Sequence, residues 1–217
     1  TYYDPKELSN KIEHRFPLFG INADLMAGKN HNLYAGFSQA YRPVIFKDII
    51  PSSVLERTDK NLQDAFGYNA ELGWRGTAGG FKWDFSGFLL QYNNRLGSVS
   101  LEENGAFYIL RTNIGNSLTY GLEAFGEYGF QLSDDIRCSV FTSTAFFHAR
   151  YQDAAVRSGN QTIDVSGKKV ESVPDVISRN GITVKFKKLS VSGLYSYTAE
   201  TFADPMNTVQ PSATGAV

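Results

Sequence analysis

Cysteine and long apolar runs are what this sequence most obviously lacks. Its 217 residues include one cysteine, Cys138, so the chain can build neither a disulfide framework nor a thiolate metal cluster. No apolar run approaches the ~18 residues that a membrane-spanning helix needs. The longest resemble Phe85–Leu90, where Ser and Gly interrupt the run. A protein that crosses a membrane with helices is therefore excluded.

Net charge is also nearly absent. The chain carries 21 basic and 22 acidic residues, which leaves a net charge of −1. That balance gives no electrostatic reason to expect nucleic acid as a partner. Aromatic residues and glycine are plentiful instead, because 16 Phe, 12 Tyr and 2 Trp make up 14% of the chain beside 20 Gly. This composition suits many strands and turns, and a soluble β-sandwich would share it.

Apolar and polar residues alternate along most of the chain, most clearly in Phe66–Arg75. Successive side chains of a strand point to opposite sides, so the alternation predicts strands with one apolar face. Each predicted strand has about 10 residues or more, the length that a tilted strand needs to cross a bilayer. The eight are Phe16–Met26, Leu33–Tyr41, Phe66–Arg75, Phe81–Tyr92, Leu118–Phe130, Ile136–Arg150, Val176–Phe186 and Leu189–Tyr197. Four apolar residues fall on the polar side of this pattern: Phe88, Leu90, Phe141 and Phe147.

The connections between these strands alternate in length. The short ones are Ala27–Asn30, Gly76–Gly80, Gln131–Asp135 and Lys187–Lys188. The long ones are Pro43–Ala65, Asn93–Ala106, Gln152–Val173 and the segment that begins at Ala199. Outer-membrane barrels have short periplasmic turns and long extracellular loops in this strict order. A Greek-key sandwich has no reason to keep it. We therefore expect an all-β fold, an antiparallel transmembrane β-barrel segment of about eight strands.

In lipid, such a barrel carries its apolar residues outward and its polar residues toward a wet lumen. Aromatic residues near the strand ends then belong to the interfacial girdle, where amphipathic rings lie at the level of the lipid headgroups. The predicted girdle residues are Tyr68, Trp74, Trp83, Tyr128, Tyr195 and Tyr197. The alternative is that these rings cover the surface or core of a sandwich.

Four segments carry a resemblance to a known family. Residues 31–43 end in an aromatic-Arg-Pro step, and residues 68–76 read Tyr-Asn-Ala-Glu-Leu-Gly-Trp-Arg-Gly. Asn-Ile-Gly at 113–115 precedes Tyr-Gly-Leu-Glu at 120–123, and Val-Pro at 173–174 precedes Asn-Gly at 180–181. In this order and spacing the sequence resembles TonB-dependent receptors, particularly their ferric-citrate-like branch.

The resemblance implies a 22-stranded barrel that is plugged by an N-terminal domain and energised through TonB. Residues 1–217 are then expected to be an interior part of one receptor barrel domain, with the plug, the early strands and the last strands outside it. No secretory signal follows Thr1, and we expect any such signal to belong to the parent protein. The implied location is the outer membrane of a Gram-negative bacterium, and the implied partners are membrane lipid, TonB and a small ferric chelate.

Ferric citrate and related chelates are anionic, and guanidinium groups suit the bidentate recognition of carboxylates. Arg42 lies at the extracellular end of its predicted strand with the parity of the polar face. Three others lie in or beside the long connections: Arg57, Arg95 and Arg111. These four are the candidate ligand-binding residues. Each is also explained by an ordinary solvated loop charge.

No catalytic constellation is visible in the sequence. The three histidines, His14, His31 and His148, show no metal-binding spacing. A nucleophile elbow, a phosphate loop and a dinucleotide fingerprint are all absent. We therefore expect neither an enzyme nor a cofactor, and no built metal site.

Several alternatives stay open at this point. Receptors of the same family import cobalamin, oligosaccharides and other siderophores. A passive porin or an autotransporter barrel would share the strand pattern, and a plug domain upstream in the parent protein would argue against both. A soluble β-sandwich that binds a ligand is the third class, and heat-modifiable mobility on gels would exclude it.

Overall fold

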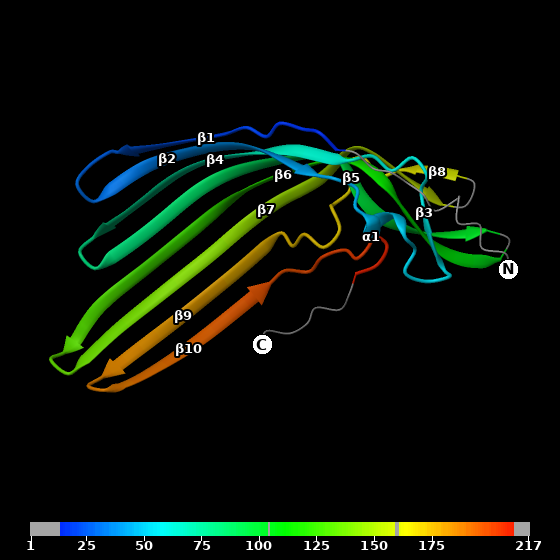
Figure 1. Cartoon of the computed structure of the whole chain (residues 1–217). Coiled ribbons are helices and arrows are strands. Elements are labelled where there is room, and N and C mark those ends of the chain that lie inside the picture. Colours follow the sequence, from blue (N-terminus) through cyan, green and yellow to red (C-terminus); the bar gives the residue numbers. More distant parts are fainter. Residues whose placement is uncertain (1–13, 104, 159–160, 211–217) are drawn as a thin grey trace.

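A computed structural model describes residues 14–103, 105–158 and 161–210. Its main feature is one antiparallel meander, in which each strand pairs with the next along an open path (Figure 1). The strands on this path are β1 (Gly20–Met26), β2 (His31–Arg42), β4 (Ala65–Ala78), β5 (Phe81–Glu103), β6 (Ala106–Ser133), β7 (Ile136–Ser158), β9 (Val176–Phe186) and β10 (Leu189–Thr198). The sheet does not close on itself, as expected for a segment of a larger barrel.

All eight predicted strands are confirmed, with two differences in length. The first begins at Gly20 rather than at Phe16. In the middle of the sheet β5, β6 and β7 reach 23, 28 and 23 residues. The first two are about twice as long as predicted, and the third is about one and a half times as long. These three strands therefore continue well beyond the others at one end of the molecule.

The segment Asn93–Ala106, predicted as a long connection outside the strands, is strand over most of its length, and the predicted end of the strand at Tyr92 is wrong. The segment continues β5 into a hairpin with β6, in which Val99 pairs with Leu110 and Leu101 with Tyr108. A register shift between Tyr92 and Arg95 interrupts the ladder, and Asn94 adopts a positive φ of 53°. Such a bulge changes which side each following residue faces. The alternation is thus broken at the bulge, which made one continuous strand read as a strand and a loop.

The other long connections also contain regular structure. Helix α1 (Phe46–Ile49) and β3 (Glu56–Thr58) lie within residues 43–65, and β3 pairs in parallel with β6. Strand β8 (Gln161–Asp164) folds back onto the end of β7. These connections lie where the sequence predicts them. Their described parts contain regular structure that pairs with the long strands β6 and β7.

The short turns all lie at one end of the sheet, as predicted (Figure 1). Gly79 and Gly80 make the turn between β4 and β5 with φ angles of 54° and 83°. Two positive φ angles in succession define a tight hairpin turn that glycine adopts without steric cost. Lys187 has a φ of 52° in the corresponding turn between β9 and β10.

The register aligns residues of one parity across all strands and so defines two faces. We call them the apolar face, which includes Leu72 and Leu122, and the polar face, which includes Tyr34 and Glu123. Phe88 and Phe147 lie on the polar face as predicted, and their ring centroids are 5.7 Å apart. Two of the predicted girdle residues, Trp74 and Trp83, lie on the apolar face toward the turns with centroids 5.1 Å apart.

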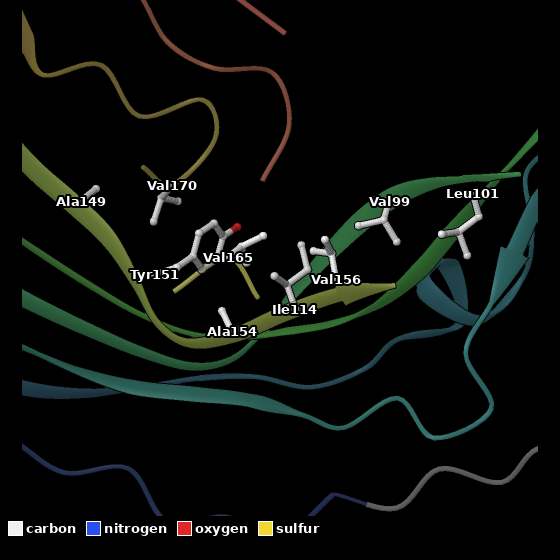
Figure 2. Packing of buried hydrophobic residues seen from close by; sticks show 9 residues of the cluster. All are labelled: Val99, Leu101, Ile114, Ala149, Tyr151, Ala154, Val156, Val165 and Val170. Carbon is white, nitrogen blue, oxygen red and sulfur yellow. The ribbon is translucent and has the colours of Figure 1, made fainter. Parts of the chain in front are cut away.

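Buried apolar side chains gather at the end that carries the long connections. Figure 2 shows the core that strands β5, β6 and β7 form there with the segment after β8. Its members are Val99, Leu101, Ile114, Ala149, Tyr151, Ala154, Val156, Val165 and Val170. We call this end the lobe (residues 43–65, 93–103, 105–117, 149–158, 161–175 and 199–210) and the rest of the sheet the wall. Among the described residues, no helix is both long enough and apolar enough to span a membrane.

Candidate ligand-binding face

The four candidate arginines all lie in the lobe or at its boundary, and the structure pairs each of them with a carboxylate. Arg42 and Arg111 converge on helix α1. Arg42 Nη2 donates to Asp48 Oδ1 at 2.9 Å, and Arg111 Nη1 lies 4.0 Å from the same oxygen. Asp48 is only 6% exposed. A buried carboxylate is costly unless it is paired, so these two arginines hold α1 against the strands.

Arg111 also fixes β3. Its Nη2 atom donates to Glu56 Oε1 at 2.6 Å, and its Nη1 atom donates to the carbonyl of Lys47 at 2.7 Å. The hydroxyl and N–H of Ser52 donate to the other oxygen of Glu56. These donors and then Arg111 hold the pKa of Glu56 below its usual range. One guanidinium thus links α1, β3 and β6.

Arg57 is the candidate with the most exposed side chain, at 57%. Its Nη1 atom lies 2.8 Å from Glu103, and its guanidinium carbon lies 4.0 Å above the ring of Tyr108. Both groups border a polar cavity of about 400 Å³ that residues of β3, β5, β6, β7 and β8 line. Asp59 lines it as well and accepts a hydrogen bond from Thr112. The cavity therefore offers one exposed cation beside hydroxyls and carboxylates.

Arg95 belongs to a buried network instead. Its Nε atom lies 3.7 Å from Glu171, which also accepts the hydroxyl hydrogen of Tyr151. Tyr151 is 1% exposed, and burial together with its bond to Glu171 raises the pKa of this tyrosine above the usual range. The network ties the segment after β8 to β5 and β7.

A further cluster joins the start of the described chain to the lobe, and no pattern in the sequence predicts it. Asp64 accepts hydrogen bonds from the N–H of Val44 at 2.8 Å and from the hydroxyl of Tyr41, and it lies 2.7 Å from His14 Nδ1. Burial alone would raise the pKa of Asp64, but these partners outweigh burial and lower it. The other ring nitrogen of His14 lies 3.2 Å from the carbonyl of Val44.

The polar face of the wall holds a second cavity, of about 470 Å³. Three carboxylates line it, Glu71, Asp84 and Glu123, together with Arg179 on the opposite side. Tyr34 reaches across β4 and donates to Asp84 at 2.8 Å. Its ring occupies the space beside Gly73, where a Cβ atom would lie 2.1 Å from the tyrosine. The sequence placed Glu123 on this face, whereas the meeting of these side chains depends on the register between strands.

No group of three His, Cys, Asp or Glu side chains within the described residues is arranged to hold a metal ion. Both cavities hold a hydroxyl that donates to a carboxylate, Thr112 to Asp59 in one and Tyr34 to Asp84 in the other. Their chemistry is that of hydrogen bonding and ion pairing with a ligand or with a protein segment.

The architecture defines a class of protein: a β-barrel wall with short turns at one end and an ordered lobe at the other. The particular family follows from a match to the model described as "TonB dependent receptor-like, beta-barrel", which covers residues 10–215. The chain belongs to this family. The family is one of outer-membrane receptors rather than enzymes.

Solved structures of such receptors share the fold. The copper transporter OprC is similar with a TM-score of 0.63 and 16% identity, over 84% of this chain and 26% of OprC. The siderophore receptor PirA from Pseudomonas aeruginosa gives 0.58 and 16%, over 84% of this chain and 33% of PirA. A variant of the ferric enterobactin receptor PfeA from the same organism, solved with enterobactin, gives 0.58 and 14%, over 92% and 31%.

The chain thus spans about a third or less of the length of these receptors. No curated protein matches the sequence.

Proposed function

We propose that this chain forms part of one barrel domain of an outer-membrane receptor that imports a metal chelate with energy supplied through TonB. The observation that carries the proposal is the two-ended architecture of a family member: a wall with one apolar face, and an ordered lobe at the end opposite the short turns. The wall contacts the outer-membrane lipid, and the lobe contributes to the vestibule that receives the ligand.

A ferric chelate is the ligand that we favour. The sequence resembles the ferric-citrate-like branch, and PirA and PfeA are named as siderophore and ferric enterobactin receptors. OprC is named as a copper transporter, which supports a metal-containing ligand more generally. Cobalamin and oligosaccharides are the rival ligands within the family, and a passive porin is the rival outside it.

Among the four arginines, we propose Arg57 as the residue that contacts the ligand. It borders the 400 Å³ cavity, and its side chain is more than half exposed beside that of Glu103. Arg42, Arg95 and Arg111 act on the ligand indirectly, because they hold buried or half-buried carboxylates and so keep the connections in place.

The test is uptake of ferric citrate by cells that carry the full-length receptor. We expect uptake that stops when TonB is deleted and that falls about tenfold at limiting ligand for Arg57→Ala, since a hydrogen bond to a charged group contributes about 1.5–3 kcal/mol. Lys60→Ala is the matched control in the same connection. Uptake without TonB would support a porin, and uptake of cobalamin or an oligosaccharide in place of iron would overturn the iron proposal.

Membrane topology is tested separately with single cysteines in intact cells. A cysteine at Asn61, in the lobe, should react with an impermeant maleimide, and one at Asp134, in a short turn, should not. The opposite pattern would contradict the assignment of the lobe to the extracellular side.

A further inference from the structure

The carboxylate beside Arg57 is held differently from the carboxylates beside the other three candidate arginines. The side chain of Glu103 is 53% exposed. The other three pairs use carboxylates whose side chains are at most 18% exposed: Asp48, Glu56 and Glu171. Breaking a buried pair leaves an uncompensated charge in the interior, whereas an exposed ion pair contributes little to stability. Glu103 is therefore the carboxylate that can leave its arginine at low cost.

Arg57 keeps its position by contacts that do not involve Glu103. Strand β3 pairs in parallel with β6 and places Arg57 opposite Leu110. The guanidinium carbon lies 4.0 Å above the ring of Tyr108, a distance at which a cation is attracted to the face of the ring. Tyr108 in turn pairs with Leu101, which is 2% exposed. The cation therefore remains beside the cavity when Glu103 moves away.

Other polar side chains that line this cavity already have partners within the lobe. Asp59 accepts hydrogen bonds from the Thr112 hydroxyl at 2.8 Å and from the N–H of Asn61 at 2.9 Å. The side chain of Asn113 accepts from the N–H of Gln63 at 2.7 Å and donates to its carbonyl at 2.9 Å. These bonds fix the connection between β3 and β4. The guanidinium is thus the lining group with the most free hydrogen-bonding capacity.

Glu103 uses little of that capacity. Arg57 Nη1 donates to Glu103 Oε2 at 2.8 Å, and within the described part of the chain this is the one hydrogen bond of the guanidinium. A guanidinium carries five N–H donors in a planar fork, and a carboxylate can take two of them in parallel. A carboxylate that binds in this bidentate way therefore competes successfully with the single contact of Glu103.

We propose that in the free receptor Glu103 occupies the position on Arg57 that a carboxylate of the ligand takes, and that this competition makes Glu103 a specificity-determining residue. The inference rests on the proposed function, in which Arg57 contacts an anionic chelate. A ligand with a bidentate carboxylate replaces Glu103, whereas an anion that makes one contact, such as chloride, gains nothing over it. Glu103 is the last residue of β5, and its half-exposed side chain becomes solvated when it is displaced.

The first test is isothermal titration of the purified full-length receptor with ferric citrate. Glu103→Gln removes the competing charge and should tighten binding about two- to fivefold, the range that an exposed ion pair contributes. Glu102→Gln is the matched control, because the adjacent residue of a strand faces the opposite side. It removes the same charge and should leave the affinity unchanged. In an Arg57→Ala background, Glu103→Gln should have no effect.

The second test needs no ligand. Phenylglyoxal modifies arginine side chains, and mass spectrometry gives the rate at each position. Arg57 should react about two- to fivefold faster in Glu103→Gln than in the wild type, because the carboxylate no longer covers the guanidinium. Arg111 is the internal reference, since its bond to Glu56 is intact in both proteins.

Each of three results would overturn the proposal: unchanged or weaker binding by Glu103→Gln, an equal gain in Glu102→Gln, or a gain that persists without Arg57. An unchanged rate of Arg57 modification would also overturn it. A wild-type receptor that does not bind ferric citrate refutes the proposed ligand alone, because the modification rate reports the contact between Arg57 and Glu103 in the free receptor.

Discussion

The wall and the lobe are built from the same strands but are stabilised differently. The buried apolar residues of the described chain all lie in the lobe, from Val44 to Val170. The wall has large apolar side chains that remain exposed, such as Leu72 at 65% and Leu122 at 63%. A single sheet has no second layer to bury them against. The wall thus depends on lipid and on neighbouring strands, whereas the lobe has a hydrophobic core of its own.

Polar groups show the same contrast. In the lobe, charged side chains such as Asp48 and Glu171 are withdrawn from solvent and paired with arginines. On the wall, the ion pair between Arg75 and Asp24 has about half of both side chains exposed. Pairs that exposed contribute little to stability. We therefore expect truncated side chains and broken ion pairs to reduce stability most in the lobe. On the wall, we expect the largest loss of stability when a polar or charged residue is placed on the apolar face.

The largest expected effect is truncation of the core of the lobe. Leu101→Ala should destabilise the extended β5–β6 hairpin by about 2–5 kcal/mol, since Leu101 is 2% exposed. Leu72→Ala on the wall should cost less than Leu101→Ala, because Leu72 is 65% exposed and its truncation leaves no cavity inside the protein. Hydrogen exchange of the full-length receptor measures both. Similar effects of the two variants would show that the lobe is not a separately packed region.

The second largest loss of stability should result from a charge on the apolar face of the wall. Leu122→Arg places a guanidinium on the proposed lipid side and should cost about 2–4 kcal/mol if the site lies near the middle of the bilayer. Phe107→Arg is the control, because Phe107 is equally exposed at 67% but lies in the lobe. Reversible unfolding in lipid vesicles gives both values. If Leu122→Arg leaves the free energy of unfolding unchanged, this face contacts water rather than lipid.

The third effect concerns the link between α1, β3 and β6. Arg111→Ala and Glu56→Ala should each increase hydrogen exchange in residues 44–58, and the double variant should add little to the larger single effect, since both remove one ion pair. Lys60→Ala should leave exchange unchanged. Fully additive effects would mean that the two residues act separately, and a direct role of Arg111 in ligand binding would then regain support.

The smallest expected effect is that the connection of residues 44–58 becomes more mobile at acidic pH. The pKa values of Glu56 and Asp64 are lowered in the folded chain. Their contribution to stability is therefore complete above about pH 5, roughly a unit above the ordinary pKa values, and is lost as pH falls through the folded values. A spin label at Ser53 should therefore become more mobile between pH 5 and pH 3, in a reversible manner. A label at Gly79, in a turn of the wall, should not respond. An increase in the mobility of the Ser53 label at alkaline pH instead would contradict the predicted direction of the pH dependence.

Much of this could be predicted from the sequence, because strand alternation is a local property. The eight strands, the short turns and the apolar face follow from residue period and turn chemistry alone. The prediction failed at Asn93 and Asn94, where a bulge in the ladder shifted the register and hid the continuation of β5. Regular structure in the other long connections was also missed, because β3 is held by a parallel partner more than 50 positions away.

The four candidate arginines show most clearly which features the sequence determines and which depend on the tertiary structure. By itself, the sequence determined which residue types stand on each face and at which end the long connections lie, since a strand turns each side chain to a fixed side. Whether an arginine is available to a ligand was decided only by the tertiary structure. Arg42, Arg95 and Arg111 are close to their carboxylates because separate connections pack together in the lobe. A cavity on the apolar face of the wall, which Ala70, Gly87 and Leu122 line, likewise requires neighbouring strands in register. Contacts between distant segments depend on register and packing, and no local pattern of residues encodes them.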